Sequence, residues 1–591
     1  MRFRRRLAVA LCVVALPASC TSSSTPRVAS VQAAADRFIS SWNAMDVEGM
    51  VGAFDDHSAA RWPATKLSRF FRNSLDAGAV RGFEVVRTQP VRQPSFPSGA
   101  SPSSGLTARV LVSVTYHSRA VTGPVRLSGT LVLVYDASSD AWEVRWNGSA
   151  LWPGVARARD FDVVYRWAKR GSITDRHGVP LARGTGADRK YPQGSLAGDA
   201  VGYLGTLSKK DVAASAGHAP ACKHGCLTGD VGDYAGKAGL EAGLDDLLAG
   251  TPTTKLELVD RKGKTLEVLG RKRGRAGRSI ETTLDVRVQR AAESALGSTV
   301  GAAVVLDPSN GDILALATSG PLDPNAYVGA NGVVPFDRSR VGLYPPGSSM
   351  KVVTATAALD TKTVSPADRF PGPYDYRGVH NFHHEHFADI SFADALKFSV
   401  NTVFAQVAEK LGGAKLYKYG KLFGFNEKPD LPLGVEASSF PRPQDDADLM
   451  FSAIGQAQVV ATPLEMATVA AAVANRGRRM EPRITKEQKP EGRRVMKVST
   501  ARTMTTLMER VVQGGTGSAA NIAGADVAGK TGTAEVDVGG KRKNHAWFIC
   551  FAPGGAPKVA VAVVAEYGGV GGEVAAPIAR SILQAVLPIA P

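Results

Sequence analysis

The sequence predicts a multidomain α+β protein whose central antiparallel sheet is assembled from distant segments. The chain has 591 residues, more than one hydrophobic core usually organises. Its composition, 44% apolar and 21% charged, is that of a folded protein. Apolar strand patterns lie at 302–317, where a turn at 307–311 predicts a hairpin, and at 546–551 and 559–566. Ala-rich helical segments separate them, so strands from both ends would share one sheet.

The first residues predict export. Met1–Arg6 is basic, and the apolar run Leu7–Ala18 that follows is too short to span a bilayer comfortably, as in a secretory signal peptide. The end of this run resembles a bacterial lipobox, with Cys20 as the lipid acceptor and Pro17 where leucine is usual. We expect lipidation of Cys20. Cleavage without a lipid and retention as a signal anchor are the alternatives.

The net charge of +17 suits an anionic membrane or wall surface, or serves solubility alone. The sequence has no zinc-knuckle spacing, phosphate loop or basic-aromatic ladder, so no nucleic-acid partner is expected. Cys222 and Cys226 are close enough for a small disulfide loop in an oxidising compartment, whereas a metal site would need more ligands than this pair and His224. Cys550 lies in an apolar run and predicts a buried strand residue.

Residues 31–154 predict a separate α+β domain. Helical spacing of apolar residues over 31–54 is followed by strand-like runs at 83–86, 108–116, 125–135 and 142–146. A helix followed by a curved antiparallel sheet is a domain of about the right size to stand alone.

The segment Tyr344–Lys351 is the strongest candidate for chemistry. Pro346 and Gly347 form a turn before the apolar run 352–359, which predicts a buried helix, so Ser348 falls at or next to its first turn. Residues three apart on a helix share a face, so the Ser348 hydroxyl and the Lys351 amine can meet. A nucleophile beside a potential base at the positive end of a helix dipole suits acyl transfer. Alone, the pair could equally be a capping serine and a solvated lysine.

Two further motifs follow in a fixed order. Ser399-Val400-Asn401 lies in the helical segment 391–411, and Lys530-Thr531-Gly532-Thr533 lies just before the terminal strands. Ser-x-x-Lys, Ser-x-Asn and Lys-Thr-Gly in this order are the pattern of penicillin-binding proteins and related β-lactamases. The sequence therefore resembles this family of serine enzymes.

Residues 170–182 (Arg-Gly-Ser-Ile-Thr-Asp-Arg-His-Gly-Val-Pro-Leu-Ala) predict a hairpin with an Asp-Arg-His-Gly turn. They also resemble the signature of the non-catalytic pedestal domain in class B penicillin-binding proteins. Residues 239–241 and 282–289 match the lead into that family's catalytic domain. Residues 454–457 and 461–467 match a later segment, with departures at Ala457 and Glu465. The pattern of 31–154 resembles the nuclear-transport-factor-like cone of methicillin-resistance-type members, which implies a spacer.

The resemblance implies a domain order. The expected parts are a signal peptide and lipobox at 1–20, a tether at 21–30, the nuclear-transport-factor-like cone at 31–154, a mostly β dimerisation or pedestal domain at 155–280, and a transpeptidase domain at 281–591. The last would be a β-lactamase-like α/β sandwich around the antiparallel sheet.

The resemblance also implies roles for the motif residues. Ser348 would attack the substrate carbonyl, with the backbone N–H groups of Ser348 and Thr533 as the oxyanion hole. Burial and the neighbouring charge of Lys530 would lower the pKa of Lys351 and allow it to act as a base. Ser399 would relay a proton and Asn401 would orient Lys351.

The Lys530 strand would recognise the substrate. Gly532 would let a peptide approach the strand as an added strand, and Lys530, Thr531 and Thr533 would donate to its carboxylate. The cluster His380, His383, His384, Glu385 and His386 is not a His-Glu-x-x-His motif and lies in a loop. Serine acyl chemistry needs no metal, so we expect no metal and no cofactor. The cluster would then line the substrate cleft.

The implied function is that of a peptidoglycan D,D-transpeptidase on the outer face of a bacterial cell membrane. It would cross-link stem peptides through an acyl-Ser348 intermediate, be trapped by β-lactams and depend on a glycosyltransferase partner. A D,D-carboxypeptidase or β-lactamase, and a non-catalytic β-lactam sensor or scaffold, are the alternatives.

Overall fold

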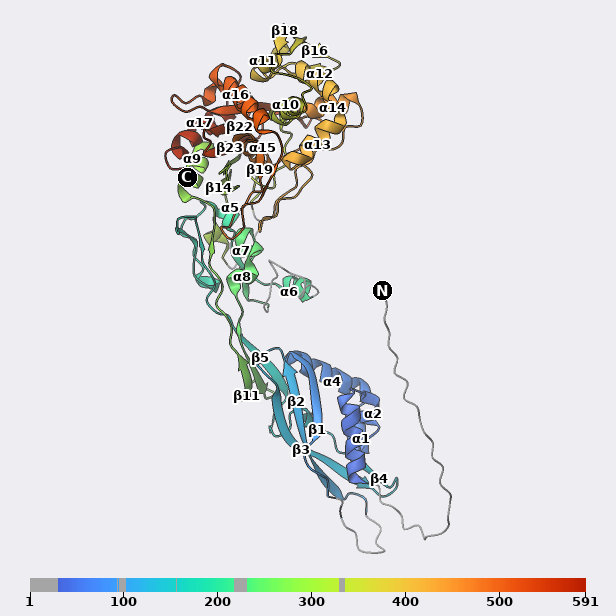
Figure 1. The fold of residues 1–591 in the computed structure, drawn as a ribbon. Coiled ribbons are helices and arrows are strands. Elements are labelled where there is room, and N and C mark those ends of the chain that lie inside the picture. The colour runs from blue at the N-terminus through green and yellow to red at the C-terminus, as the bar shows by residue number, and fades with distance from the viewer. Residues whose placement is uncertain are drawn as a thin grey trace. The chain divides into compact units, whose positions relative to one another are not determined.

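The computed structural model describes residues 30–92, 94, 103–155, 157–216, 231–328 and 335–590. The export segment with Cys20, and the pair Cys222 and Cys226, lie outside the described residues. The chain divides into two compact units, one formed by 1–166 with 252–274 and the other by 167–251 with 275–591 (Figure 1). Within the described ranges, no helix is both long and apolar enough to cross a bilayer.

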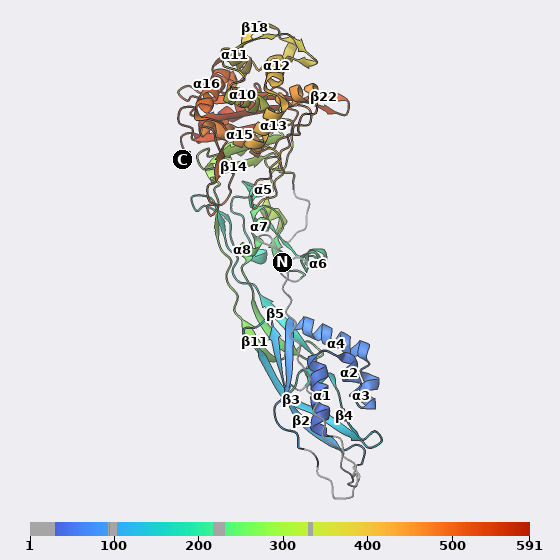
Figure 2. The same cartoon turned by 45° about the vertical axis from the view of Figure 1, so that its right-hand side comes forward.

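The first unit packs helices on an antiparallel sheet (Figure 2). The sheet has the strand order β1-β2-β3-β4, and its strands are β1 (Val80–Arg87), β2 (Thr107–Ser118), β3 (Val125–Asp136) and β4 (Ala141–Val144). The helices are α1 (Val31–Asn43), α2 (Val47–Val51), α3 (Asp56–Arg61) and α4 (Ala64–Ala77). The four predicted strands are therefore confirmed. The helical segment over 31–54 is broken, because Met45 has a positive φ and Asp46 caps a new helix.

A second sheet joins this unit, with the order β11-β10-β5. Its strands are β5 (Asp160–Arg166), β10 (Thr253–Val259) and β11 (Thr265–Lys272). Leu256 and Leu258 of β10 belong to the same aromatic-rich core as Phe38, Trp42 and Trp146. The first unit thus includes residues 155–166 and 252–274, which were expected to belong to the domain at 155–280. The boundaries of the predicted domains stay a prediction.

The second unit begins with short elements. The predicted hairpin is confirmed as β6 (Ile173–Thr174) and β7 (Pro180–Ala182), which β12 (Ile280–Glu281) extends. The neighbouring elements are α5 (Gly198–Val201), β8 (Leu204–Thr206), α6 (Lys209–Ala216), β9 (Tyr234–Gly236), α7 (Gly239–Gly243) and α8 (Asp245–Ala249).

Four buried charges tie these elements together. Arg170 Nη2 lies 2.7 Å from Glu241 Oε2 and 2.8 Å from Asp245 Oδ1, and Arg189 Nε lies 2.6 Å from Glu241 Oε1. All four side chains are buried. The first residue of the hairpin signature and the last residue of Gly239-Leu240-Glu241 are therefore ion-pair partners, which gives both motifs a structural reason.

The rest of the unit is built on the expected antiparallel sheet, with the strand order β14-β13-β23-β22-β21. Its strands are β13 (Gly301–Leu306), β14 (Ile313–Thr318), β21 (Ala528–Val538), β22 (Lys541–Ala552) and β23 (Val559–Ala565). The hairpin at 302–317 is confirmed as the pair of β13 and β14. Strands from distant segments thus share one sheet, as predicted.

Both faces of this sheet are buried. Along β22, Trp547, Ile549 and Phe551 belong to one core while Phe548 and Cys550 belong to the other. This alternation follows from the two-residue period of a strand. Helices α9 (Val286–Leu296) and α17 (Ala575–Val586) cover the Cys550 face. Cys550 is a buried strand residue, as expected.

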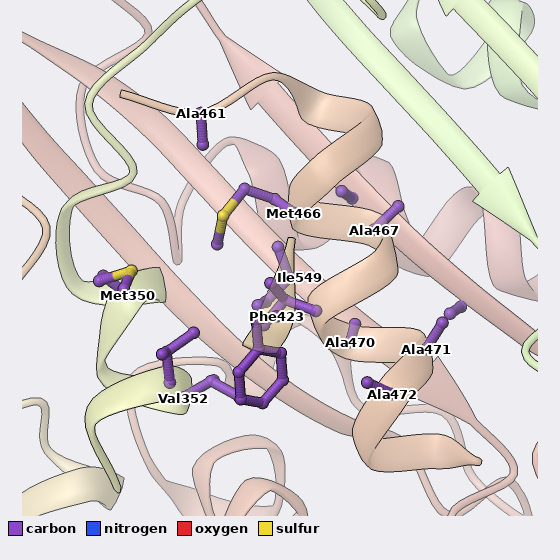
Figure 3. Close-up of a cluster of buried hydrophobic side chains, with 14 of the residues drawn as sticks. Met350, Val352, Phe423, Ala461, Met466, Ala467, Ala470, Ala471, Ala472 and Ile549 are labelled. Atoms are coloured by element: carbon purple, nitrogen blue, oxygen red, sulfur yellow. The ribbon is translucent and has the colours of Figure 1, made fainter. Parts of the chain in front are cut away.

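Helix α15 (Pro463–Ala474) covers the other face, and all twelve of its residues are buried. Its side chains share one core with Ile549 of β22 and with Met350 and Val352, which lie where helix α10 (Lys351–Asp360) begins (Figure 3). The remaining helices of this part are α11 (Phe392–Lys397), α12 (Asn401–Leu411), α13 (Gly413–Phe423), α14 (Asp446–Ala453) and α16 (Val498–Gly514). The short outer strands are β15 (Arg369–Gly372), β16 (Asp375–Tyr376), β17 (Val379–His380), β18 (Phe387–Ser391), β19 (Arg478–Met480) and β20 (Gly492–Arg494).

Candidate active site

Ser348 lies on a tight turn in front of a buried helix. Residues Gly347–Met350 form a 3-10 turn, and α10 begins at Lys351. Gly347 has φ +52°, and a Cβ atom there would lie 2.8 Å from the Thr533 carbonyl oxygen, so only glycine fits. Its N–H donates to the Gly455 carbonyl at 2.9 Å, which holds the turn from the other side. Ser348 is half-buried and lines a pocket of about 930 Å³.

Lys351 is fully buried and points to the second motif. Its Nζ donates to Asn401 Oδ1 and to the Ser399 carbonyl, both at 2.6 Å, and lies 3.2 Å from Ser399 Oγ. Nζ also lies 5.2 Å from the centre of the Phe404 ring. No hydrogen bond between Ser348 and Lys351 is present among the described residues. The two side chains share a turn, and Lys351 is held by Ser399 and Asn401.

Ser399 lies between two helices. The segment 391–411 was expected to be one helix, but α11 ends at Lys397 and α12 begins at Asn401. Ser399 adopts φ +61°, a left-handed conformation that is unfavourable for a residue with a side chain. This break turns the Ser399 carbonyl and hydroxyl toward Lys351, and it places Asn401 at the first turn of α12. Asn401 Nδ2 donates to the His380 carbonyl at 2.8 Å, which fixes the amide.

Lys530 reaches the same hydroxyl from the sheet. It lies on β21, an edge strand, and its Nζ donates to Ser399 Oγ at 2.8 Å and to the Thr531 carbonyl at 3.0 Å. Ser399 Oγ is therefore shared by two lysines, both with no exposed surface. Burial lowers the pKa of Lys530 to about 7. Burial and the charge of Lys530 hold the pKa of Lys351 well below its ordinary value.

Two residues of the third motif lie at the pocket. Thr531 and Thr533 line it, and Thr531 Oγ1 is 2.6 Å from Thr516 Oγ1. Gly532 faces the other way. A Cβ atom there would lie 2.6 Å from Ser349 Oγ and 2.7 Å from the Pro346 carbonyl oxygen, so glycine lets β21 pack against the turn that carries Ser348.

Most of the histidine cluster forms part of the pocket wall. His380, His383, His384 and Glu385 line the same pocket as Ser348. His383 and His384 have positive φ values, and the His384 ring lies 4.5 Å from that of Tyr374. Within the described part of the chain, no group of three or more histidine, cysteine, aspartate or glutamate side chains could hold a metal ion.

Some contributors were not assigned from the sequence. The Phe404 ring lies under Lys351. Phe404 follows Asn401 by three positions on α12, so the helical period puts both on the same face of the helix, and this spacing was the one available signal. Phe398 and Phe451 line the pocket as exposed or half-buried aromatic side chains. Single aromatic residues in helical segments usually belong to a core, so the sequence carries no distinct signal for them.

A hydroxyl on a tight turn, together with two buried lysines that meet at a second hydroxyl, defines the class of serine acyl-transfer proteins. The comparisons agree with this class. Residues 301–584 match the family model of the penicillin-binding protein transpeptidase domain, and residues 183–282 match that of the penicillin-binding protein dimerisation domain. The peptidoglycan D,D-transpeptidase PbpA of Mycobacterium tuberculosis is 34% identical over 361 residues, covering 53% of this chain and 73% of the relative.

Solved structures extend the likeness. Penicillin-binding protein A of M. tuberculosis, as its ceftriaxone acyl-enzyme complex, has a TM-score of 0.58 at 28% identity and covers 71% of this chain and 98% of that chain. The D,D-transpeptidase domain of a peptidoglycan glycosyltransferase from Eggerthella lenta has a TM-score of 0.57 at 30% identity. The match covers 72% of this chain and 99% of that chain. The chain belongs to the class B penicillin-binding proteins.

Proposed function

We propose that this protein is a serine-type peptidoglycan D,D-transpeptidase that also binds β-lactams covalently. The observation that carries the proposal is the Ser399 hydroxyl, which lies 2.8 Å from Lys530 Nζ and 3.2 Å from Lys351 Nζ beside the pocket that holds Ser348. Lysines that are buried without a carboxylate partner favour their neutral form, and a neutral amine can accept a proton.

In the first half-reaction, Ser348 Oγ attacks the carbonyl carbon of the penultimate D-alanine of a stem peptide. Neutral Lys351 takes the hydroxyl proton, and the N–H groups of Ser348 and Thr533 stabilise the negative charge on the carbonyl oxygen. The C–N bond then breaks, and a proton reaches the departing amine through Ser399. Free D-alanine leaves, and the stem stays on Ser348 as an ester.

In the second half-reaction, an amine of a neighbouring stem attacks the ester carbon. The new amide forms, the C–O bond to Ser348 breaks, and the proton lost by the amine returns to the serine oxygen. Thr531 and Thr533 donate to the terminal carboxylate of the donor stem, or to that of a β-lactam, on the edge strand, and buried Lys530 supports them from behind through the Thr531 carbonyl.

Mass spectrometry of the protein with a stem mimic ending in D-Ala-D-Ala, with and without an acceptor amine, tests the proposal. We expect an acyl adduct on Ser348 and, with the amine, a new amide. Ser348→Ala should give neither, whereas Ser349→Ala, which removes a buried hydroxyl with no hydrogen-bond partner among the described residues, should give both. Free acid in place of amide would identify a hydrolase. An adduct that forms equally on Ser348→Ala would exclude the assignment altogether.

The same proposal includes the cellular location, the polymerase partner and the role of residues 31–154. Cys20 carries a lipid that holds the protein on the outer face of the cell membrane, and a separate glycosyltransferase supplies the glycan strands. Residues 31–154 form a nuclear-transport-factor-like spacer, which the helices on one antiparallel sheet support. Incorporation of a labelled fatty acid into the wild type but not into Cys20→Ser would support the anchor, and equal labelling would refute it.

A further inference from the structure

A second pocket of about 620 Å³ lies in the pedestal part of the second unit. It is lined by segments 169–174, 183–190 and 276–279, with Pro180. None of its lining residues lines the pocket of Ser348. It therefore has no part in the acyl transfer proposed above.

The pocket is cationic. Lys169, Arg183 and Lys190 line it with exposed side chains, and no ion pair of theirs is present among the described residues. Asp188 is the one carboxylate among the lining residues. Arg170 also lines the pocket, but its charge is balanced from inside by Glu241 and Asp245.

Two of these cations are placed directly opposite each other. Arg183 and Lys190 form an antiparallel bridge in which each backbone N–H donates to the other's carbonyl, at 2.9 Å and 2.7 Å. In such a pair the two side chains leave the same face about 5.5 Å apart, and like charges there are destabilising. A bound anion would remove this repulsion.

The loop that carries the pair is fixed. Arg189 Nη1 donates to the Gly184 carbonyl at 2.9 Å and to the Gly171 carbonyl at 2.8 Å, and Arg189 is itself paired with buried Glu241. Thr185 Oγ1 accepts from the Arg170 N–H at 2.9 Å. The backbone that carries the two cations is therefore held in place before any ligand arrives.

Hydroxyl groups complete the lining. Ser172, Thr174 and Ser279 all face the pocket, and Ser172 Oγ lies 2.9 Å from Ser279 Oγ. A guanidinium, two ammonium groups and hydroxyls match the several oxygens of a phosphate group, which arginine binds in a bidentate manner.

We propose that this pocket is a phosphate-binding site on the pedestal. The phosphate comes either as a free phosphate or pyrophosphate ion or as the headgroup of an anionic phospholipid. This function is independent of the transpeptidase reaction.

Calorimetric titration of the full chain tests the site, with inorganic pyrophosphate in one arm and glycerophosphoglycerol, the water-soluble headgroup of phosphatidylglycerol, in the other. We expect Arg183→Gln/Lys190→Gln to weaken binding of at least one probe by about tenfold or more, because two charge-assisted contacts are lost. Lys415→Gln/Lys418→Gln removes the same charge from exposed positions on α13 and should bind within about twofold of the wild type.

The two arms identify the source. Loss of pyrophosphate binding alone indicates a free ion, and loss of headgroup binding indicates a lipid. Equal binding by both double variants, or no binding of either probe by the wild type, overturns the proposal, because the interaction would then be general charge attraction or absent.

Thermal unfolding at low salt supplies an independent readout. Relief of the repulsion should raise the Tm of Arg183→Gln/Lys190→Gln above that of the wild type, and pyrophosphate should raise the Tm of the wild type only. A lower Tm of this variant without ligand contradicts the proposal. If the double variant fails to fold, Lys169→Gln replaces it in the titration. Acylation of Ser348 by a fluorescent penicillin should stay unchanged in every folded variant.

Discussion

Two groups of buried charges in the second unit differ in how they are balanced. Beside the hairpin of β6 and β7, Arg170 and Arg189 face Glu241 and Asp245 at 2.6 to 2.8 Å. At the candidate active site, Lys351 and Lys530 are equally buried, but their partners among the described residues are neutral, chiefly Ser399. The balanced group fixes the positions of chain segments. The unbalanced group opposes folding, because burial of an amine without a counter-charge costs free energy. The same burial lowers the pKa of both lysines, so that their amines can be neutral.

The largest effect is expected from Lys351→Met, which keeps the length of the side chain and removes the amine. Acylation by a fluorescent penicillin should fall by about 10³-fold, since the amine that is proposed to take the Ser348 proton is lost. The same change should leave the protein as stable as the wild type or more so, because burial of an amine without a charged partner no longer costs free energy.

Lys410→Met is the matched control for this prediction. Lys410 also lies over an aromatic ring, that of Phe370 at 4.4 Å, but it is exposed. Acylation by this variant should stay within about twofold of the wild type, because a surface charge contributes little. Acylation by Lys351→Met at the control rate would show that another base acts.

The balanced group should respond in the opposite way. Glu241→Gln leaves two buried arginines with one carboxylate, and the free energy of unfolding should fall by about 3 to 5 kcal/mol in urea titrations. Each folded molecule should still acylate at the wild-type rate. Glu487→Gln, which breaks the exposed pair with Arg278, should cost less than about 1 kcal/mol. Equal losses of unfolding free energy in Glu241→Gln and Glu487→Gln would mean that burial does not increase the cost of breaking an ion pair.

The sequence predicted which residues lie together at the candidate active site better than it predicted their contacts. The order of the three motifs brought Ser348, Ser399 and Lys530 together because those residue types serve one reaction. It could not predict the left-handed Ser399. The apolar spacing continues through 391–411 without glycine or proline, and the conformation depends on contacts with Lys351. Local pattern favours one helix there, and tertiary contacts impose two.

The same limit explains two other differences. Arg170 and Glu241 form an ion pair although they lie 71 positions apart. The charge pattern of the two motifs does not predict that these residues pair. The strands over 252–274 contribute Leu256 and Leu258 to the first unit, although they follow residues of the second. Alternation predicts that a strand has a buried face, but it does not say which distant core covers that face.

The smallest expected effect is the dependence of stability on pH, which tests the unbalanced charge directly. The pKa of Lys530 lies at about 7 in the folded protein, against 10.5 for an ordinary lysine. Between these values the unfolded chain binds a proton that the folded chain does not, so the free energy of unfolding should rise with pH. One lysine contributes at most about 1.4 kcal/mol per pH unit, and the rise ends above the ordinary pKa. Urea titrations at about pH 7, 8 and 9 should therefore give a shallower rise for Lys530→Met than for the wild type, and an unchanged rise for Lys410→Met. If Lys530→Met keeps the slope of the wild type, the buried lysine holds an ordinary pKa, and the contrast between the two groups of charges fails at the active site.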